Sequence, residues 1–529
     1  MATHIPTGKS TPKILKATSA HQTKTNSGLP IGILLLLALA AGAMFSLALA
    51  PYYLYPIAII SPMVLYALLT AKNDGRRAFW LGQFYGFGTW AVGAFWLYTS
   101  IHEYGGIPNY LALMMIGAMA FIMGLFHGVM SWVFVRFLGR QPLAFAGLWV
   151  LQEWLKTWLL TGFPWLFVGY AFTEVTWLNG LAPITGVFGL SFLAVLFGAA
   201  TIELFRHRGG YMAIAGLLAI ATSIISYVAP AWTKPTGDKL QVSLVQGNIP
   251  QDLKWLAEYR LESLNIYAKL TQSEWGRDVV IWPEAAVPIF QDEIAPLLAE
   301  IYNHAHASGS SWITGIPYRE EGRLYNGVMS FDDKVGVYRK QNLVPFGEYI
   351  PFSGLLNILP NLPGLPEPFS KGDANQAPLS IKNKAAGVAI CYEVAYPDTT
   401  RQNAKNSDFL LTVSNDAWFG TSAGPLQHLQ MVQMRSLENG RWFVRATNNG
   451  VTAIINEKGQ VVSSLPQFVP AVLRGEVLGF VGSTPYAILG HYPILVVSVL
   501  LILLSGVVRL TANHSSSREK HYTANGVRD

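Results

Sequence analysis

Cysteine and charge are the two features that this chain of 529 residues has least of. It contains a single cysteine, Cys391, which excludes a disulfide bond within the chain. Charged residues make up 13% of the sequence, whereas soluble proteins carry about 25%. Hydrophobic residues make up 51%. The composition therefore predicts a membrane protein that also carries some soluble mass.

Three further absences narrow the possible functions. The sequence has no glycine-rich phosphate loop, no His/Cys spacing typical of a metal site and no repeat of fixed period. Residues 232–484 hold 21 Lys and Arg against 24 Asp and Glu, a net charge near −3, without a basic stripe. This balance disfavours nucleic-acid binding. We therefore expect no cofactor, no metal and no nucleic-acid partner.

Apolar runs long enough to span a bilayer, which takes about 20 residues in a helix, recur along the chain. We count eight of them, near residues 31–49, 53–71, 79–100, 110–137, 142–160, 180–204, 211–230 and 485–508. They predict a polar tail over 1–29, seven transmembrane helices over 30–231, a soluble domain over 232–484, an eighth helix over 485–509 and a second tail over 510–529.

The positive charges orient these spans. Sixteen Lys and Arg lie outside residues 232–484, and all but Lys156 fall on one side of the membrane if the spans alternate. Positive loops stay in the cytoplasm. The pattern thus predicts cytoplasmic termini and a soluble domain on the outer face of the membrane.

Two charged residues, Glu153 and Lys156, interrupt the fifth predicted span. Their spacing places them on one helix face, where they could pair. Charges within a membrane are costly and often functional, but we favour the alternative of a structural pair or of a Lys156 that reaches out to the interface. The turn that follows, Thr161–Trp165, has the composition of an interfacial turn with an aromatic anchor.

The soluble segment mixes strand and helix patterns. We predict strands over 240–246, 279–282, 312–316, 326–331, 335–339, 386–390, 409–413, 443–447 and 451–455, and helices near 255–273, 292–308, 394–405 and 425–439. Pro230–Asp238 reads as a linker. Strands interleaved with helices indicate a layered α/β domain. One stretch, Phe352–Phe369, is apolar yet rich in Pro and Gly, which is typical of a lipid-facing or pocket-covering loop or of a loop packed in the core.

Three short stretches carry candidate chemistry, and each follows a predicted strand. They are Ile281–Ala285, which contains Glu284, Tyr338–Glu348, which contains Lys340, and Gly387–Glu393, which contains Cys391. A thiol needs a base to become a thiolate, which a buried carboxylate with a raised pKa could supply, and an ammonium could stabilise the oxyanion formed on an acyl carbonyl. Taken singly, the cysteine could be a buried hydrophobe, the glutamate an ion-pair partner and the lysine an exposed cation.

Together and in this order, the three stretches resemble the Glu-Lys-Cys triad of the carbon–nitrogen hydrolase (nitrilase) superfamily. That resemblance implies an αββα sandwich. Further stretches are similar to the bacterial apolipoprotein N-acyltransferase family: LVQGNIPQ at 244–251, LKW at 253–255, LVPFGE at 343–348, CYE at 391–393, SNDAWFG at 414–420 and TNNG at 447–450.

The resemblance implies an enzyme that moves an acyl chain from a phospholipid, such as phosphatidylethanolamine, to the α-amine of a diacylglyceryl-cysteine on an apolipoprotein. In that mechanism Cys391 is the nucleophile, Glu284 the base and Lys340 the oxyanion stabiliser. Supporting or substrate-binding positions are Glu348, which would orient Lys340 or the substrate, and Trp255, Tyr392, Glu393, Asn415 and Trp418. Asn448 would shape the pocket.

Two other functions fit parts of this pattern. A membrane-tethered amidase would use the same triad to hydrolyse a C–N bond. A transporter or receptor would use the outer domain only for binding, but the complete Glu-Lys-Cys set and the lack of two matching broken-helix halves disfavour this alternative.

Overall fold

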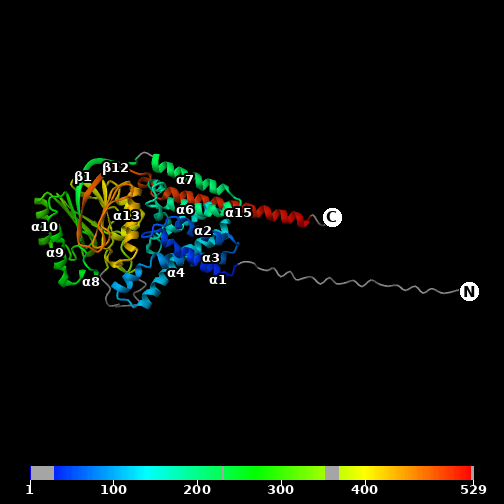
Figure 1. The fold of residues 1–529 in the computed structure, drawn as a ribbon, viewed down its shortest axis with the longest axis horizontal. Coiled ribbons are helices and arrows are strands. Elements are labelled where there is room, and N and C mark those ends of the chain that lie inside the picture. Colours follow the sequence, from blue (N-terminus) through cyan, green and yellow to red (C-terminus); the bar gives the residue numbers. More distant parts are fainter. Residues whose placement is uncertain (2–28, 229–230, 352–367, 526–529) are drawn as a thin grey trace.

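The computed structural model describes residue 1 and residues 29–228, 231–351 and 368–525. A bundle of apolar helices and an α/β domain lie next to each other along the long axis of the molecule (Figure 1). The predicted tail over 2–28 and the loop residues 352–367 lie outside the described part of the chain.

The bundle contains seven helices that precede the α/β domain and one that follows it. They are α1 (Ile31–Met44), α2 (Ile57–Thr70), α3 (Gly75–Gly93), α4 (Asn109–Val133), α5 (Pro142–Leu155), α6 (Ala182–Phe205), α7 (Gly210–Val228) and α15 (Tyr492–Asn525). The last helix continues well past Arg509, into the segment predicted as a polar tail.

Not all of these helices are long and apolar enough to cross a membrane alone. Within the described ranges, five stretches are: 31–48, 109–138, 179–205, 210–228 and 492–511. Helix α2 is apolar but shorter, and α5 has 14 residues. The structure therefore supports a membrane protein but does not confirm the count of eight spans.

Helix α3 belongs to the bundle because of close packing. It carries five glycines and two arginines, so its apolarity is low. A Cβ atom at Gly86 would lie 2.7 Å from the Cα of Gly124 in α4, and one at Gly88 would lie 2.2 Å from the carbonyl oxygen of Leu39 in α1. Small residues let helices in a membrane approach this closely.

The two charged residues of the fifth span have different surroundings. Glu153 accepts hydrogen bonds from Trp149 Nε1 (3.1 Å) and from the main-chain N–H of Val168 (2.9 Å). Lys156 is 2% exposed, and its Nζ lies 5.5 Å from the ring centre of Phe167. The expectation that Lys156 reaches outward is wrong, because its buried ammonium lies over the rings of Trp90 and Phe167. The expected direct pair is wrong too, since no ion pair within 4.0 Å joins Lys156 to Glu153 among the described residues.

The α/β domain contains two six-stranded sheets. The first has the order β12 (Ala471–Gly482), β1 (Thr233–Gln246), β2 (Val279–Ile281), β3 (Ser311–Glu320), β4 (Arg323–Phe331) and β5 (Val335–Arg339). The second has the order β11 (Val461–Ser464), β10 (Ala453–Ile455), β9 (Phe443–Thr447), β8 (Phe409–Ser414), β7 (Lys384–Ile390) and β6 (Leu379–Ile381).

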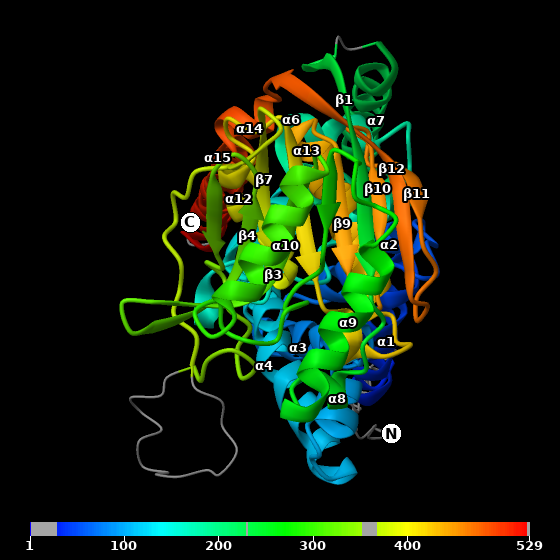
Figure 2. The same ribbon diagram turned by 90° about the vertical axis from the view of Figure 1, so that its left-hand side faces the viewer.

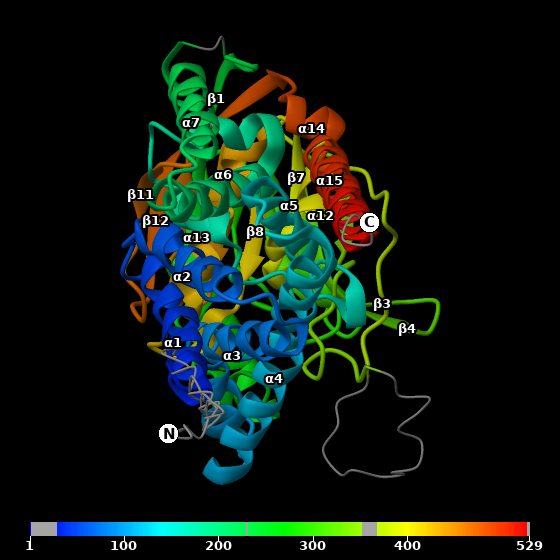
Figure 3. The same ribbon diagram turned by 90° about the vertical axis from the view of Figure 1, so that its right-hand side faces the viewer.

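The two sheets pack face to face and form the middle of a four-layer sandwich. Their shared core consists of alternating strand residues such as Val242, Ile281, Val388 and Val413. Helices α9 (Arg260–Thr271) and α10 (Ala295–Ala307) cover the first sheet (Figure 2). Helices α12 (Pro397–Asn403) and α13 (Gly424–Asn439) lie between the second sheet and the bundle (Figures 1 and 3). The short helices α8 (Gln251–Lys254) and α14 (Pro485–Leu489) complete the domain.

Helix α13 joins the domain to the bundle through polar side chains. Gln427 accepts a hydrogen bond from Trp165 Nε1 at 2.7 Å, Gln430 accepts one from the main chain of Ala50 at 3.1 Å, and Glu438 accepts one from Val187 at 2.8 Å. All but one of its residues are buried. A helix buried on every side this way must satisfy its polar groups within the protein.

Most predicted strands and helices are present, with two kinds of difference. The prediction of a linker over 230–238 is wrong in part, because strand β1 begins at Thr233, which pairs with Gly482 of β12. Strands β6, β11 and β12 were not predicted. Most side chains of β11 are exposed, and buried and exposed side chains alternate only weakly along β12. Neither strand therefore has a clear apolar pattern in the sequence.

Candidate active site

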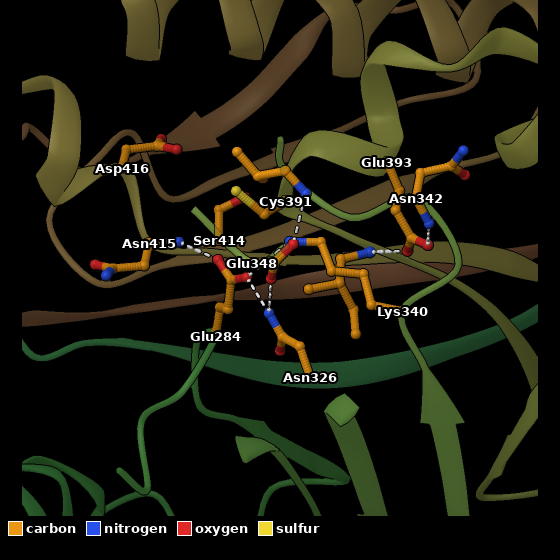
Figure 4. A network of polar contacts seen from close by, with 12 residues as sticks. Glu284, Asn326, Lys340, Asn342, Glu348, Cys391, Glu393, Ser414, Asn415 and Asp416 are labelled. Carbon is orange, nitrogen blue, oxygen red and sulfur yellow. Dashed lines mark hydrogen bonds and ion pairs between the residues drawn. The ribbon is translucent and has the colours of Figure 1, made fainter. Parts of the chain in front are cut away.

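The three residues of the predicted triad meet between the two sheets. Glu284 follows β2 and Lys340 follows β5, and these strands run in the same direction within the first sheet. Cys391 follows β7 of the second sheet. Their side chains point toward one another at the same edge of the sandwich (Figure 4). The fold thus gathers three positions that are spread over 107 residues of sequence.

Glu284 is held by donors on both carboxylate oxygens. Oε1 accepts from Asn326 Nδ2 at 2.8 Å and from Lys340 Nζ at 3.3 Å, and Oε2 accepts from the main-chain N–H of Asn415 at 2.8 Å. Burial alone would raise the pKa of this carboxyl, but the Lys340 ammonium and the Asn326 amide outweigh it and hold the pKa below its ordinary value. The expected raised pKa is therefore wrong for this state of the site.

Lys340 is shared between two carboxylates. It is 1% exposed, and its Nζ lies 2.9 Å from Glu348 Oε1. Asn326 Nδ2 also donates to Glu348 at 2.7 Å, so one amide links both carboxylates. Burial opposes the charged form of the lysine, yet Glu348 and Glu284 prevail and raise its pKa. Lys340 is thus a fixed cation.

Cys391 lies on a sharp turn from β7 into a short 3₁₀ helix, Cys391–Ala395. Its φ angle is +49°, in the left-handed region that side chains other than glycine rarely adopt. Such a conformation costs on the order of 1–3 kcal/mol and is concentrated at functional sites. Burial, together with the nearby Glu284 carboxylate, raises the pKa of the thiol well above its ordinary value. The resting pair is therefore a neutral thiol beside a carboxylate.

Glu393 fastens the Cys391 turn to the Lys340 loop. Its Oε1 accepts from the main chain of Gln341 (2.5 Å) and Asn342 (3.1 Å), and its Oε2 accepts from Ile390 N (2.7 Å) and from Tyr338 Oη (3.0 Å). Burial raises the pKa of this carboxyl to about 7, although the main-chain donors oppose the rise. Both carboxylate oxygens are thus occupied by protein donors, which link the two loops.

A buried polar network reaches Cys391 from α13. His428 Nε2 lies 2.9 Å from the carbonyl oxygen of Cys391 and, because that oxygen can only accept, the ring nitrogen donates. Asp416 lies 3.2 Å from the other ring nitrogen and 2.5 Å from Arg445. Burial would raise the pKa of Asp416, but Arg445 lowers it. Sequence reasoning assigned none of these three residues a role.

The asparagines at the site shape its wall. Asn415 Nδ2 donates to Gln251 Oε1 at 2.6 Å, and its Oδ1 accepts from Asn448 Nδ2 at 3.0 Å. Both asparagines are buried. The two predicted tryptophans lie farther out. Trp255 is 43% exposed, and Trp418 is 41% exposed beside Tyr104, with 6.1 Å between their ring centres.

The turn over 161–165 reaches from the bundle to the nucleophile. Trp165 is 2% exposed and stacks on Tyr392 with ring centres 6.4 Å apart. Tyr396 Oη donates to the carbonyl oxygen of Gly162 at 3.3 Å. The expectation that Trp165 anchors this turn at a lipid interface is wrong, because the aromatic ring packs inside the protein, next to the residue that follows Cys391.

Sequence reasoning missed Asn326, Lys254 and His428. Asn326 is the first residue of a predicted strand, and the strand pattern does not show that its side chain faces the site. His428 lies within the pattern of an ordinary amphipathic helix. Lys254 does have a signal in the sequence, because it lies inside the LKW stretch, in which only the tryptophan is predicted to have a role. It is 1% exposed, and its Nζ donates to the carbonyl oxygen of Glu284 at 3.0 Å.

The arrangement supplies a nucleophile, a proton acceptor and a fixed cation around one space, which is the equipment for acyl transfer through a thioester. The fold that holds them is that of a carbon–nitrogen hydrolase. The family model for "Carbon-nitrogen hydrolase" matches residues 241–486, and the model for "Apolipoprotein N-acyltransferase N-terminal domain" matches residues 41–200.

The whole chain also matches curated proteins. It is 42% identical to an apolipoprotein N-acyltransferase of Pseudomonas putida over 494 residues, which cover 90% of this chain and 97% of the relative. It is 43% identical to that of Azotobacter vinelandii, over 88% of this chain and 93% of the relative. The chain belongs to the apolipoprotein N-acyltransferase family.

Among solved structures, a carbon–nitrogen hydrolase superfamily protein of Xanthomonas campestris matches 49% of this chain and 97% of its own, with 19% identity and a TM-score of 0.36. That likeness is too distant to carry an argument about residues.

Proposed function

We propose that this membrane enzyme transfers a fatty acyl chain from a phospholipid to the α-amine of the N-terminal S-diacylglyceryl-cysteine of apolipoproteins, the last step of bacterial lipoprotein maturation. Identity of 42% to an apolipoprotein N-acyltransferase over nearly the full length of both chains is the observation that carries the proposal. A phosphatidylethanolamine-like lipid is the proposed donor.

In the first half-reaction, the sulfur of Cys391 attacks the ester carbonyl of the phospholipid while Glu284 takes the thiol proton. The oxyanion that forms is stabilised by the Lys340 ammonium. The carbon–oxygen bond then breaks, Glu284 returns the proton to the departing oxygen, and a lysophospholipid leaves. The acyl group remains on Cys391 as a thioester. The contacts of Glu284 and Lys340 support these roles.

In the second half-reaction, the neutral α-amine of the apolipoprotein attacks the thioester carbonyl. Glu284 accepts a proton from the amine, Lys340 again stabilises the oxyanion, and the carbon–sulfur bond breaks. Glu284 then protonates the departing Cys391 thiolate. The products are the N-acylated lipoprotein and the free enzyme, and no redox partner or metal is required for the balance.

The remaining predicted positions act around this chemistry. The 2.9 Å contact supports Glu348 as the residue that orients Lys340. The contacts of Glu393 and Asn415 support positioning roles for both. We propose that Tyr392, Trp255 and Trp418 contact the substrates, since Tyr392 adjoins the nucleophile and the two tryptophans are exposed beyond it.

We further propose eight spans, with the domain over 232–484 on the periplasmic face and both termini in the cytoplasm of the inner membrane. The distribution of Lys and Arg supports this orientation. A membrane position also suits the substrates, because each CH₂ that leaves a bilayer costs about 0.8 kcal/mol and a diacylated substrate cannot diffuse away.

The test is mass spectrometry of purified enzyme incubated with phosphatidylethanolamine. We expect an acyl adduct on Cys391 that a diacylglyceryl-cysteine peptide discharges, with recovery of the N-acylated peptide. The Cys391→Ala variant should carry no adduct. An adduct that water discharges as fast as the peptide does would show an amidase-like hydrolase, and wild-type transfer by Cys391→Ala would overturn the mechanism.

A further inference from the structure

A second lysine lies beside the triad. Lys254 is the last residue of α8 and is 1% exposed, and its Nζ donates to the main-chain carbonyl oxygen of Glu284 at 3.0 Å. The next residue, Trp255, faces outward and is 43% exposed. Within this stretch, therefore, the lysine and not the tryptophan reaches the site of chemistry.

Helix α8 is fastened to Glu284 from two sides. Lys254 binds the carbonyl oxygen of Glu284, while Gln251 accepts from Asn415 Nδ2 at 2.6 Å. Asn415 in turn donates its main-chain N–H to the carboxylate of Glu284 at 2.8 Å. A lysine at the surface is held loosely and contributes little to stability. These attachments, by contrast, hold Lys254 in a fixed position beside Glu284.

A count of charges gives this second cation a purpose. Lys340 contacts both Glu284 and Glu348, so these three groups carry a net charge of −1. Asp416 is balanced by Arg445. Transfer of the Cys391 proton to Glu284 leaves the total at −1 and moves the negative charge onto sulfur. Lys254 brings the total to zero, in a buried site where uncompensated charge is costly.

The electrostatic surroundings agree with this count. Burial lowers the pKa of Lys254 to about 8, while the Glu284 carboxylate and Cys391 oppose the decrease. The ammonium form therefore still dominates near neutral pH. The groups that influence the thiol or the Glu284 carboxyl from every packed element are Lys254 on α8, Glu284 after β2, Lys340 and Glu348 after β5, Asp416 after β8 and His428 on α13.

We propose that Lys254 is a positioning residue of the active site that fixes the main chain of Glu284 and stabilises negative charge on the Glu284–Cys391 pair while the thiolate forms. This inference rests on the proposed function for its purpose, but it concerns a property of the free enzyme that can be measured without either substrate.

The experiment measures the alkylation of Cys391 by iodoacetamide from pH 6 to 10, read by mass spectrometry on detergent-purified enzyme. Because the chain has one cysteine, all label reports this thiol. Three variants separate the contributions: Lys254→Arg keeps the charge, Lys254→Gln keeps a donor without charge, and Lys254→Met removes both. Lys405→Met removes an exposed lysine and is the matched control.

We expect Lys254→Met and Lys254→Gln to slow alkylation about tenfold or more at each pH, as a thiol pKa one unit higher would. Lys254→Arg should retain most of the rate, and Lys405→Met all of it. Wild-type alkylation in Lys254→Met would overturn the proposal. So would a wild-type rate in Lys254→Gln, since the hydrogen bond alone would then suffice.

Each variant is accepted only if its thermal unfolding midpoint in detergent lies near that of the wild type. If Lys254→Met does not fold, Lys254→Gln against Lys254→Arg still separates charge from fold, because both keep a donor toward Glu284. Suppose that the wild-type enzyme forms no acyl adduct, but the Lys254 variants still slow the alkylation of Cys391. That result would refute the proposed function and leave this inference standing.

Discussion

Replacing Glu393 by glutamine tests whether the Lys340 loop and the Cys391 turn are fastened by one carboxylate. The change preserves the shape of the side chain but converts one oxygen into an NH₂ group, which cannot accept a hydrogen bond. The four donors around Glu393 are Gln341 N, Asn342 N, Ile390 N and Tyr338 Oη. Three of them are main-chain groups that cannot turn away.

The structure predicts which hydrogen bond of residue 393 is lost in Glu393→Gln. The Tyr338 hydroxyl can rotate and accept from an NH₂ group, so the amide nitrogen should face Tyr338 and Ile390. The Gln341 and Asn342 contacts then survive, and the main-chain N–H of Ile390 loses its acceptor. One lost hydrogen bond to a charged group costs about 1.5–3 kcal/mol. Because Ile390 precedes Cys391, the damage falls on the nucleophile and not on Lys340.

Two measurements check this reasoning. The unfolding midpoint should drop by roughly 3–12 °C, since 1 kcal/mol shifts a domain of this size by about 2–4 °C. Formation of the acyl-enzyme in a single turnover should slow by about 100-fold, as expected for a displacement of about 1 Å. Glu300→Gln, on the exposed side of α10, is the control. A wild-type midpoint together with a wild-type rate in Glu393→Gln would refute the role of this carboxylate.

Two other predictions concern the charge of the base and the orientation of the domain. The pKa of Glu284 is held below its ordinary value, so this carboxylate stays ionised in mild acid, whereas the pKa of Glu393 lies at about 7. In Glu393→Gln, where position 393 no longer titrates, acyl-enzyme formation should therefore change less than about twofold between pH 7 and pH 5 before it falls at lower pH; a steep loss between pH 7 and pH 6 in that variant, measured by stopped-reaction mass spectrometry, would contradict this. A reporter active only in the cytoplasm should be silent when inserted at Glu321, in the turn between β3 and β4, and active when fused after Asp529, whereas the reverse pattern would rule out the proposed orientation.

Much of the α/β domain could be predicted because its strands are buried and their residues are of uniform type. Strands β5 and β9 begin and end as expected, and each predicted triad residue directly follows or closely follows a strand. Strands β11 and β12 could not be found, because they lie toward the sheet edges and mix exposed polar with apolar residues. The count of eight spans is not confirmed for a related reason: glycine packing holds α3 in the bundle, and hydropathy does not measure packing.

At the candidate site, the residues predicted to react could be found in the sequence more readily than the residues that hold them in place. Glu284, Lys340 and Cys391 could be predicted because their residue types suit acyl transfer and because their order along the chain resembles a known triad, although each taken singly has another interpretation. His428 and Asn326 have no such signature, because their roles depend on which atoms lie 3 Å away after folding. The pKa of Glu284 likewise could not be deduced, since its direction depends on whether burial or Lys340 prevails.

The position of α13 explains why the nucleophile lies against the membrane bundle. One face of this helix hydrogen-bonds bundle residues through Gln427, Gln430 and Glu438, and its next side chain, His428, holds the carbonyl oxygen of Cys391. The strained φ of Cys391 is thus fixed by a helix that the membrane helices themselves hold in place. The ring of Trp165, from the turn over 161–165, stacks on Tyr392, so the residue that follows Cys391 is also packed against the bundle.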